Sequence, residues 1–83
     1  MHPVTARRDR QTGRRILARN LRRLRLERKL SQEDLAYEAG VRQALISELE
    51  SGKIDVRLGT LDRLAAALAV RLCDLFEEGR RGT

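Results

Sequence analysis

The chain has 83 residues, a formal net charge of +6 and 41% hydrophobic residues, a length that suits one small domain. Aromatic residues are nearly absent, and the abundance of Leu, Ala, Arg and Glu favours helices over strands. One histidine (His2) and one cysteine (Cys73) give no plausible metal site, cofactor site or catalytic nucleophile set, so we expect no enzyme. No apolar run could span a membrane and a lone cysteine forms no internal disulfide, which predicts a cytoplasmic protein.

Basic residues are concentrated in the first third of the sequence. Residues 1–29 hold eleven Arg and Lys against two acidic residues, whereas residues 30–83 hold seven against ten. This asymmetry predicts an anionic partner, with a merely solvated surface as the alternative. Residues 1–12 lack apolar periodicity and are interpreted as a flexible basic arm. Its arginines, continued by Arg14 and Arg15, either lie along phosphates or only keep the chain soluble.

Apolar residues recur at helical spacing across a predicted domain at residues 13–78, which a frayed tail at 79–83 follows. Ser31 and Asp34 form the pattern of a capping box at the start of the second helix, and Gly40 suits its end. Leu26 and Leu58 fit the apolar patterns of the first and fourth helices. The predicted helices are 13 to near 29, 32–39, 43–50, 58–68 and 72–78, the last burying Leu72, Leu75 and Phe76.

Two short helices joined by a turn at Gly40 and Val41 give the pattern of a helix-turn-helix. The segments LSQEDLAYEAGV, ISELESGK and TLDRLAAALAVRLCDLF, in this order and spacing, resemble the XRE family of phage-repressor-like DNA-binding domains. The resemblance covers about residues 14–77. It implies an all-α, five-helix, lambda-repressor-like domain that binds double-stranded DNA as a homodimer. The third helix then enters the major groove, and the second crosses the phosphate backbone.

Roles in DNA binding follow from the resemblance and from helical spacing in the third helix. Ile46 and Leu49 are expected to point inward, so the remaining faces are available to bases. Residues before and after this helix suit phosphate contacts. The alternative for every residue named here is an exposed position that only contacts water and has no role in DNA binding. The predicted base-reading residues are Arg42, Gln43, Ala44, Ser47 and Glu48, and the predicted phosphate contacts are Gln32, Ser51, Lys53 and Arg57.

Two acidic residues of the third helix require separate explanations. In the XRE family the position of Glu50 commonly pairs with an arginine of the first helix, which here is Arg25, so the resemblance implies a structural ion pair. Glu48 should face the groove, where it can accept a hydrogen bond from the N4 amine of cytosine. Alternatively, Glu48 pairs with Arg42 or with a residue of a second subunit, or the domain binds DNA weakly or binds something else.

Three predicted helix starts depart from the family, which usually has Ser or Thr there. The residues at these N-cap positions are Arg42, Arg57 and Arg71. Arginine cannot accept hydrogen bonds from the helix N–H groups, and its charge opposes the helix dipole. We expect Asp55 to compensate for Arg57 and Asp74 to compensate for Arg71, whereas nothing evident compensates for Arg42.

The leading hypothesis is a sequence-specific transcriptional regulator, a dimeric autorepressor that uses Leu58, Val70 and Leu72 in its subunit interface. The alternative is a protein-interaction adaptor with the same fold, such as an antitoxin-like module. The net charge of −3 over residues 30–83 and the acidic Glu48 motivate that alternative.

Overall fold

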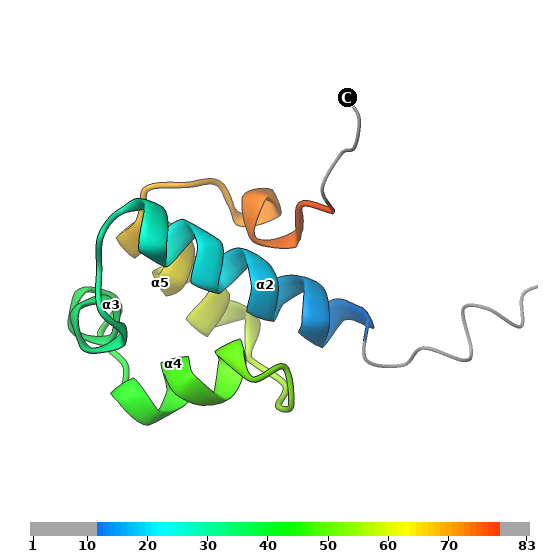
Figure 1. Cartoon of the computed structure of the whole chain (residues 1–83), viewed down its shortest axis with the longest axis horizontal. Coiled ribbons are helices and arrows are strands. Elements are labelled where there is room, and N and C mark those ends of the chain that lie inside the picture. The colour runs from blue at the N-terminus through cyan, green and yellow to red at the C-terminus, as the bar shows by residue number, and fades with distance from the viewer. Residues whose placement is uncertain (1–11, 79–83) are drawn as a thin grey trace, which may run out of the picture.

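The computed structural model describes residues 12–78, and every regular element in that range is helical (Figure 1). This agrees with the predicted all-α class. The predicted arm and tail lie outside the described residues, except that Thr12, assigned to the arm, already belongs to the first helix. The elements are α2 (Thr12–Glu27), α3 (Gln32–Ala39), α4 (Gln43–Glu50), α5 (Leu58–Leu68) and the 3-10 helix η1 (Leu72–Phe76).

The fifth helix is shorter than the predicted 72–78 and is the 3-10 helix η1, which ends at Phe76, so the described residues hold four α-helices and one 3-10 helix. The backbone of Glu77 is extended (φ −64°, ψ 127°), so the helix cannot continue. The buried side chain of Asn20 holds this conformation from α2, since its Nδ2 donates to the carbonyls of Leu75 at 3.0 Å and Glu77 at 2.8 Å. Only one of the three apolar residues expected to be buried here is buried: Leu72 and Phe76 are 36% and 38% exposed.

The core is built from leucines and small apolar residues of all five described elements. Helix α2 packs against α4 and η1, while α3 packs against α4 and α5. Leu26 and Leu58, which fit the apolar patterns of α2 and α5, are 50% and 64% exposed. Leu26 follows the buried Leu24 by two positions, which turns it to the opposite side of α2, and Leu58 is the first residue of α5. The fully buried large side chains are Leu21, Leu35, Ile46, Leu49, Leu64, Leu68 and Leu75.

The helix ends follow the capping pattern only in part. Ser31 and Asp34 form the predicted capping box, and the hydrogen bond from the Ser31 backbone N–H lowers the pKa of Asp34 below its usual range. The carboxylate of Asp74 accepts from the Arg71 N–H at 2.9 Å, as expected. Asp55 does not compensate for Arg57, because its carboxylate bonds to an arginine of α2 instead. The side chains at the N-caps of α4 and α5 make no capping bond.

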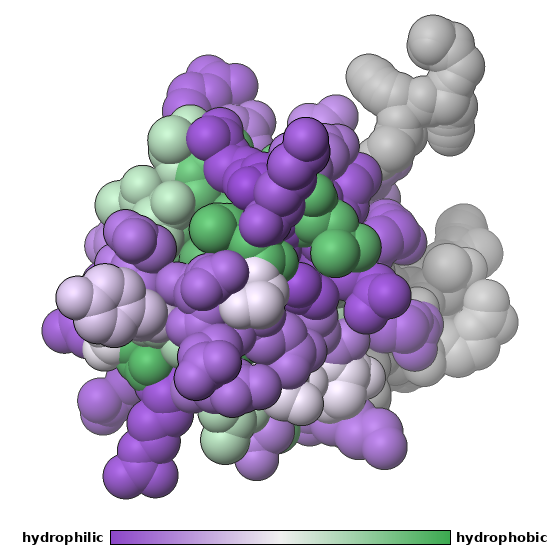
Figure 2. Space-filling view, turned by 60° about the vertical axis from the view of Figure 1, so that its left-hand side comes forward, coloured by the Kyte–Doolittle hydropathy of each residue, from purple (hydrophilic) through white to green (hydrophobic). Residues whose placement is uncertain are grey.

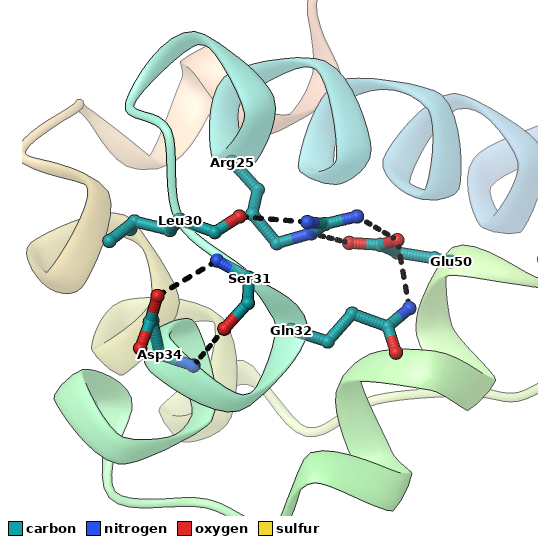
Figure 3. A network of polar contacts seen from close by, with 6 residues as sticks. All are labelled: Arg25, Leu30, Ser31, Gln32, Asp34 and Glu50. Atoms are coloured by element: carbon teal, nitrogen blue, oxygen red, sulfur yellow. Dashed lines mark hydrogen bonds and ion pairs between the residues drawn. The ribbon is translucent and has the colours of Figure 1, made fainter.

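Arg25 and Glu50 form a buried ion pair that joins three helices (Figure 3). Arg25 Nε lies 2.7 Å from Glu50 Oε2 and its Nη2 lies 3.0 Å from Oε1, while its Nη1 donates to the Leu30 carbonyl at 2.8 Å. The two side chains are 8% and 5% exposed. The hydrogen bonds to Glu50 raise the pKa of Arg25 above its ordinary value, so the guanidinium stays charged. The pair therefore fixes the end of α2 and the entry to α3 against the end of α4.

Two turns place residues other than glycine in the left-handed region. Lys29 has φ 60° after α2, and Ala69 has φ 58° at the C-cap of α5. A side-chain Cβ is unfavourable there, whereas glycine adopts this conformation without strain. Gly40, with φ 71°, shows the expected residue in the same role at the end of α3.

Ala69→Gly should therefore stabilise the fold by about 0.5–1 kcal/mol, since relief of the left-handed conformation exceeds the added entropy of the unfolded chain. Urea unfolding measures this change. Ala66→Gly is the matched control, because Ala66 is exposed but lies inside α5. That control should destabilise the domain by about 0.5–1 kcal/mol, and a loss of stability in both variants would contradict the prediction.

Arg25→Ala should lower the free energy of unfolding by about 3 kcal/mol or more, because it leaves the Glu50 carboxylate buried without its partner. It also removes the donor to the Leu30 carbonyl. Thermal and urea unfolding give the size of the effect. Arg22→Ala, at an exposed position of the same helix, serves as the control and should stay near wild-type stability. Equal stability of Arg25→Ala and wild type would show that the ion pair contributes nothing.

Candidate nucleic-acid interface

Helices α3 and α4 are joined by a tight turn that fixes the orientation of α4. The left-handed Gly40 ends α3, the N–H of Val41 donates to the Ala36 carbonyl at 2.9 Å, and α4 begins at Gln43. Ile46 and Leu49 are 0% and 1% exposed, so they anchor the inner face of α4 in the core. The opposite face of α4 is consequently directed away from the domain.

The residues predicted to read bases occupy this outer face. Their chemistry suits base edges: an amide for adenine, a methyl group for thymine, a hydroxyl for several bases and a carboxylate for cytosine. Within residues 12–78 the Glu48 carboxylate has no ion pair, so the suggested pairing with Arg42 is not formed and the acid is available to a ligand. The exposed residues at and after the N-cap of α4 are Arg42, Gln43, Ala44, Ser47 and Glu48.

Three of the predicted phosphate contacts lie between the end of α4 and the start of α5. Ser51 is the C-cap of α4, and its Oγ donates to the Glu48 carbonyl at 2.6 Å. The side chain of Lys53 is exposed in the following loop, and Arg57 is exposed at the uncapped start of α5. All three residues thus follow the proposed reading helix in the chain, and their side chains are exposed.

The loop that carries these cations is held by an arginine of α2. Arg14 Nε donates to Asp55 Oδ1 at 2.8 Å, and Arg14 Nη1 donates to the Lys53 carbonyl at 3.5 Å. The hydrogen bond from Arg14 lowers the pKa of Asp55 below its usual range, so the carboxylate stays ionised. Arg14, which the sequence analysis grouped with the arginines of the basic arm, therefore belongs to α2 and contacts the α4–α5 loop.

Gln32, the fourth predicted phosphate contact, is the first residue of α3 and is partly buried. Its Nε2 donates to Glu50 Oε1 at 3.2 Å, so one of its two amide hydrogens is engaged within the domain (Figure 3). The structure thus brings Gln32 next to the Arg25–Glu50 pair. Sequence spacing gave no signal for this contact, because the two residues lie on different helices.

Arg63 is a cation near the interface that the sequence analysis missed. It lies on α5, and its Nη1 approaches the Gly40 carbonyl at 3.4 Å, beside the turn that leads into α4. Nothing in the apolar pattern of α5 distinguishes this arginine from one that is only solvated. Only the packing of α5 against α3 places it near the turn.

The face of the molecule in Figure 2 is mostly hydrophilic, with patches of apolar residues between charged ones. No helix among residues 12–78 is long and apolar enough to cross a membrane. The same part of the chain contains no group of three or more His, Cys, Asp or Glu side chains that could hold a metal ion. Large apolar side chains with substantial exposure are Leu26, Tyr37, Leu58, Leu72 and Phe76.

Comparison with known proteins agrees with this geometry. The chain is 32% identical over 63 residues to the control protein C.BamHI of Bacillus amyloliquefaciens, an alignment that covers 75% of this chain and 78% of that protein. A hypothetical transcription factor of Neisseria meningitidis is 36% identical over 68 residues, which make up 82% of this chain but 64% of the Neisseria protein. The crystal structure of the restriction-modification controller protein C.AhdI of Aeromonas hydrophila superposes with a TM-score of 0.74 at 33% identity, covering 76% of this chain and 96% of that one.

Residues 21–75 match the helix-turn-helix family HTH_3, a span that includes α3, α4 and α5 completely. The family consists of transcriptional regulators and not of enzymes. The sequence match, the relatives and the α3–α4 geometry agree with one another. The chain belongs to the helix-turn-helix family HTH_3, the XRE-type DNA-binding transcriptional regulators.

Proposed function

We propose that the protein is a cytoplasmic, homodimeric repressor that binds a specific operator in double-stranded DNA and controls its own transcription. The observation that carries this proposal is the outer face of α4, where three exposed polar side chains of different hydrogen-bonding character and one exposed methyl group stand on a helix anchored by Ile46 and Leu49. A groove-reading helix needs this combination of a rigid inner face and varied polar groups outside.

Cations around α4 support the assignment of phosphate contacts. Arg42 precedes the helix, and Lys53 and Arg57 follow it, all with exposed side chains. Arginines at the N-caps of α4 and α5 make no capping bonds. We infer that these arginines contact DNA. Their presence lowers the stability of the helices, since each N-cap without an acceptor costs about 1 kcal/mol of folding free energy.

Exposed apolar side chains support a homodimer. Leu58 begins α5 and Leu72 begins η1, and both are exposed, while Val70 is partly buried and packs against the core. A second copy that covers Leu58, Leu72 and Phe76 would remove this surface from water. In such a dimer, two α4 helices about 34 Å apart would read half-sites one turn of DNA apart.

The names of the relatives suggest the biological setting. C.BamHI is a control protein and C.AhdI is a restriction-modification controller protein. We propose a comparable control role for this chain, in which its own concentration sets the occupancy of the operator. An adaptor function remains the alternative to be tested, because Glu48 places an unpaired negative charge on the reading face.

Selection from a library of random duplexes should recover a two-fold symmetric sequence with half-sites about 10 bp apart. Competition between the selected and a scrambled duplex then measures specificity at about 50 mM and about 200 mM salt. A preference of about 1,000-fold or more should survive at the higher salt, because base contacts depend on salt less than phosphate contacts do. Recovery of no motif, with equal and salt-sensitive binding to all duplexes, would refute the operator and favour the adaptor.

Glu48→Ala should relax the preference at one base pair, by about 1–3 kcal/mol, and change folding stability little. Binding of duplexes substituted at each position of the selected site measures this effect, and Gln43→Ala should act similarly at a different base pair. Glu38→Ala is the control, because it removes an exposed negative charge from α3. If Glu48→Ala instead strengthens binding to all sequences equally, the carboxylate only repels phosphates and reads no base.

A further inference from the structure

Glu50 makes three hydrogen bonds, and one of them has no role in the ion pair. Two come from Arg25, and the third comes from Gln32 Nε2, 3.2 Å from Glu50 Oε1. The Glu50 side chain is 5% exposed and both of its carboxylate oxygens bond the guanidinium, so it offers Gln32 a fixed acceptor. A buried residue at the end of α4 thus reaches the first residue of α3 (Figure 3).

The charge of Glu50 determines which way the Gln32 amide faces. An ionised carboxylate only accepts hydrogen bonds, so the amide must direct its nitrogen and not its oxygen toward Glu50. Figure 3 shows this arrangement, with the amide oxygen of Gln32 on the side away from Glu50. A flip of the amide would place the Gln32 oxygen against the Glu50 oxygen, and two acceptors repel each other. In the observed orientation, the second hydrogen of Gln32 Nε2 remains for an external acceptor.

We propose that Glu50 is a positioning residue for DNA binding: it fixes the Gln32 amide so that the remaining N–H is already directed to a phosphate. This inference rests on the proposed function, in which Gln32 contacts the DNA backbone. A free glutamine loses side-chain rotamer freedom when it binds, whereas an amide fixed in advance has lost that freedom during folding. Arg25 acts one step further away, because it immobilises the carboxylate that orients Gln32.

A double-mutant cycle separates this role from a purely structural one. Glu50→Gln keeps the size of the side chain but replaces one acceptor oxygen by a donor group, so it no longer dictates the direction of the Gln32 amide. In the wild-type background this change should weaken binding to the selected operator about three- to tenfold. In the Gln32→Ala background it should weaken binding no further. Equal weakening in both backgrounds would overturn the proposal, since Glu50 would then act through the fold alone.

One control variant and two further outcomes complete the double-mutant cycle. Glu27→Gln is the matched control, because it removes an exposed carboxylate that pairs with Arg23 on the surface of α2, and it should leave affinity unchanged. If Gln32→Ala binds the operator as tightly as wild type, the positioning role is overturned while the regulator function stands. If the wild type selects no sequence, both proposals fail together.

A measurement on the wild-type protein remains decisive even if Glu50→Gln does not fold. Side-chain ¹⁵N relaxation without DNA compares the amide group of Gln32 with that of Gln43, an exposed glutamine on α4. The Gln32 group should approach the order parameter of a rigid backbone, about 0.85, whereas the Gln43 group should fall below about 0.6. Equal mobility of the two amides would overturn the proposal.

Discussion

The rest of the structure depends on the burial of one ion pair between Arg25 and Glu50. Removing two charges from water is expensive, and the cost is offset only when each charge has close, well-directed partners. Here the guanidinium bonds the carboxylate through two nitrogens and the Leu30 carbonyl through a third. Those partners come from the end of α2, the entry to α3 and the end of α4, so the pair is satisfied only when these segments adopt one relative position.

This constraint links the stability of the domain to the geometry of its DNA-binding face. The core holds the inner sides of α3 and α4, but leucine packing by itself tolerates small shifts, since apolar contacts are not directional. The ion pair is directional, and Gln32 is bonded to it. Beyond the end of α4, Arg14 bonds to Asp55 and to the carbonyl of Lys53 in the loop that leads to α5. Two arginines of α2 thus contact the last residue of α4 and the loop that follows it, and only the Arg25–Glu50 pair is buried.

The distribution of charge over α4 favours discrimination over affinity. Arginines and a lysine surround the helix, whereas its exposed face carries a carboxylate without a partner in the described part of the chain. Such a carboxylate weakens binding to any phosphate backbone and is compensated only where a suitable base donor meets it. Arginine at the N-caps of α4 and α5 makes no capping bond, which lowers helix stability, and the proposed phosphate contacts would give these residues a role in binding. Nothing in the structure links Arg71, at the start of η1, to this interface.

Local rules applied to the sequence determined the helical class, the boundaries of α3 and α4, the capping box and the left-handed Gly40, because each depends on residues a few positions apart. The inward direction of Ile46 and Leu49 followed from the same periodicity. Only the tertiary structure decided where η1 ends, which partner Asp55 takes and where the Gln32 amide points. Those outcomes depend on contacts between residues far apart in the chain: Asn20 with Glu77, Arg14 with Asp55, and Gln32 with Glu50. No spacing rule encodes them, since they form only when the core brings the helices together.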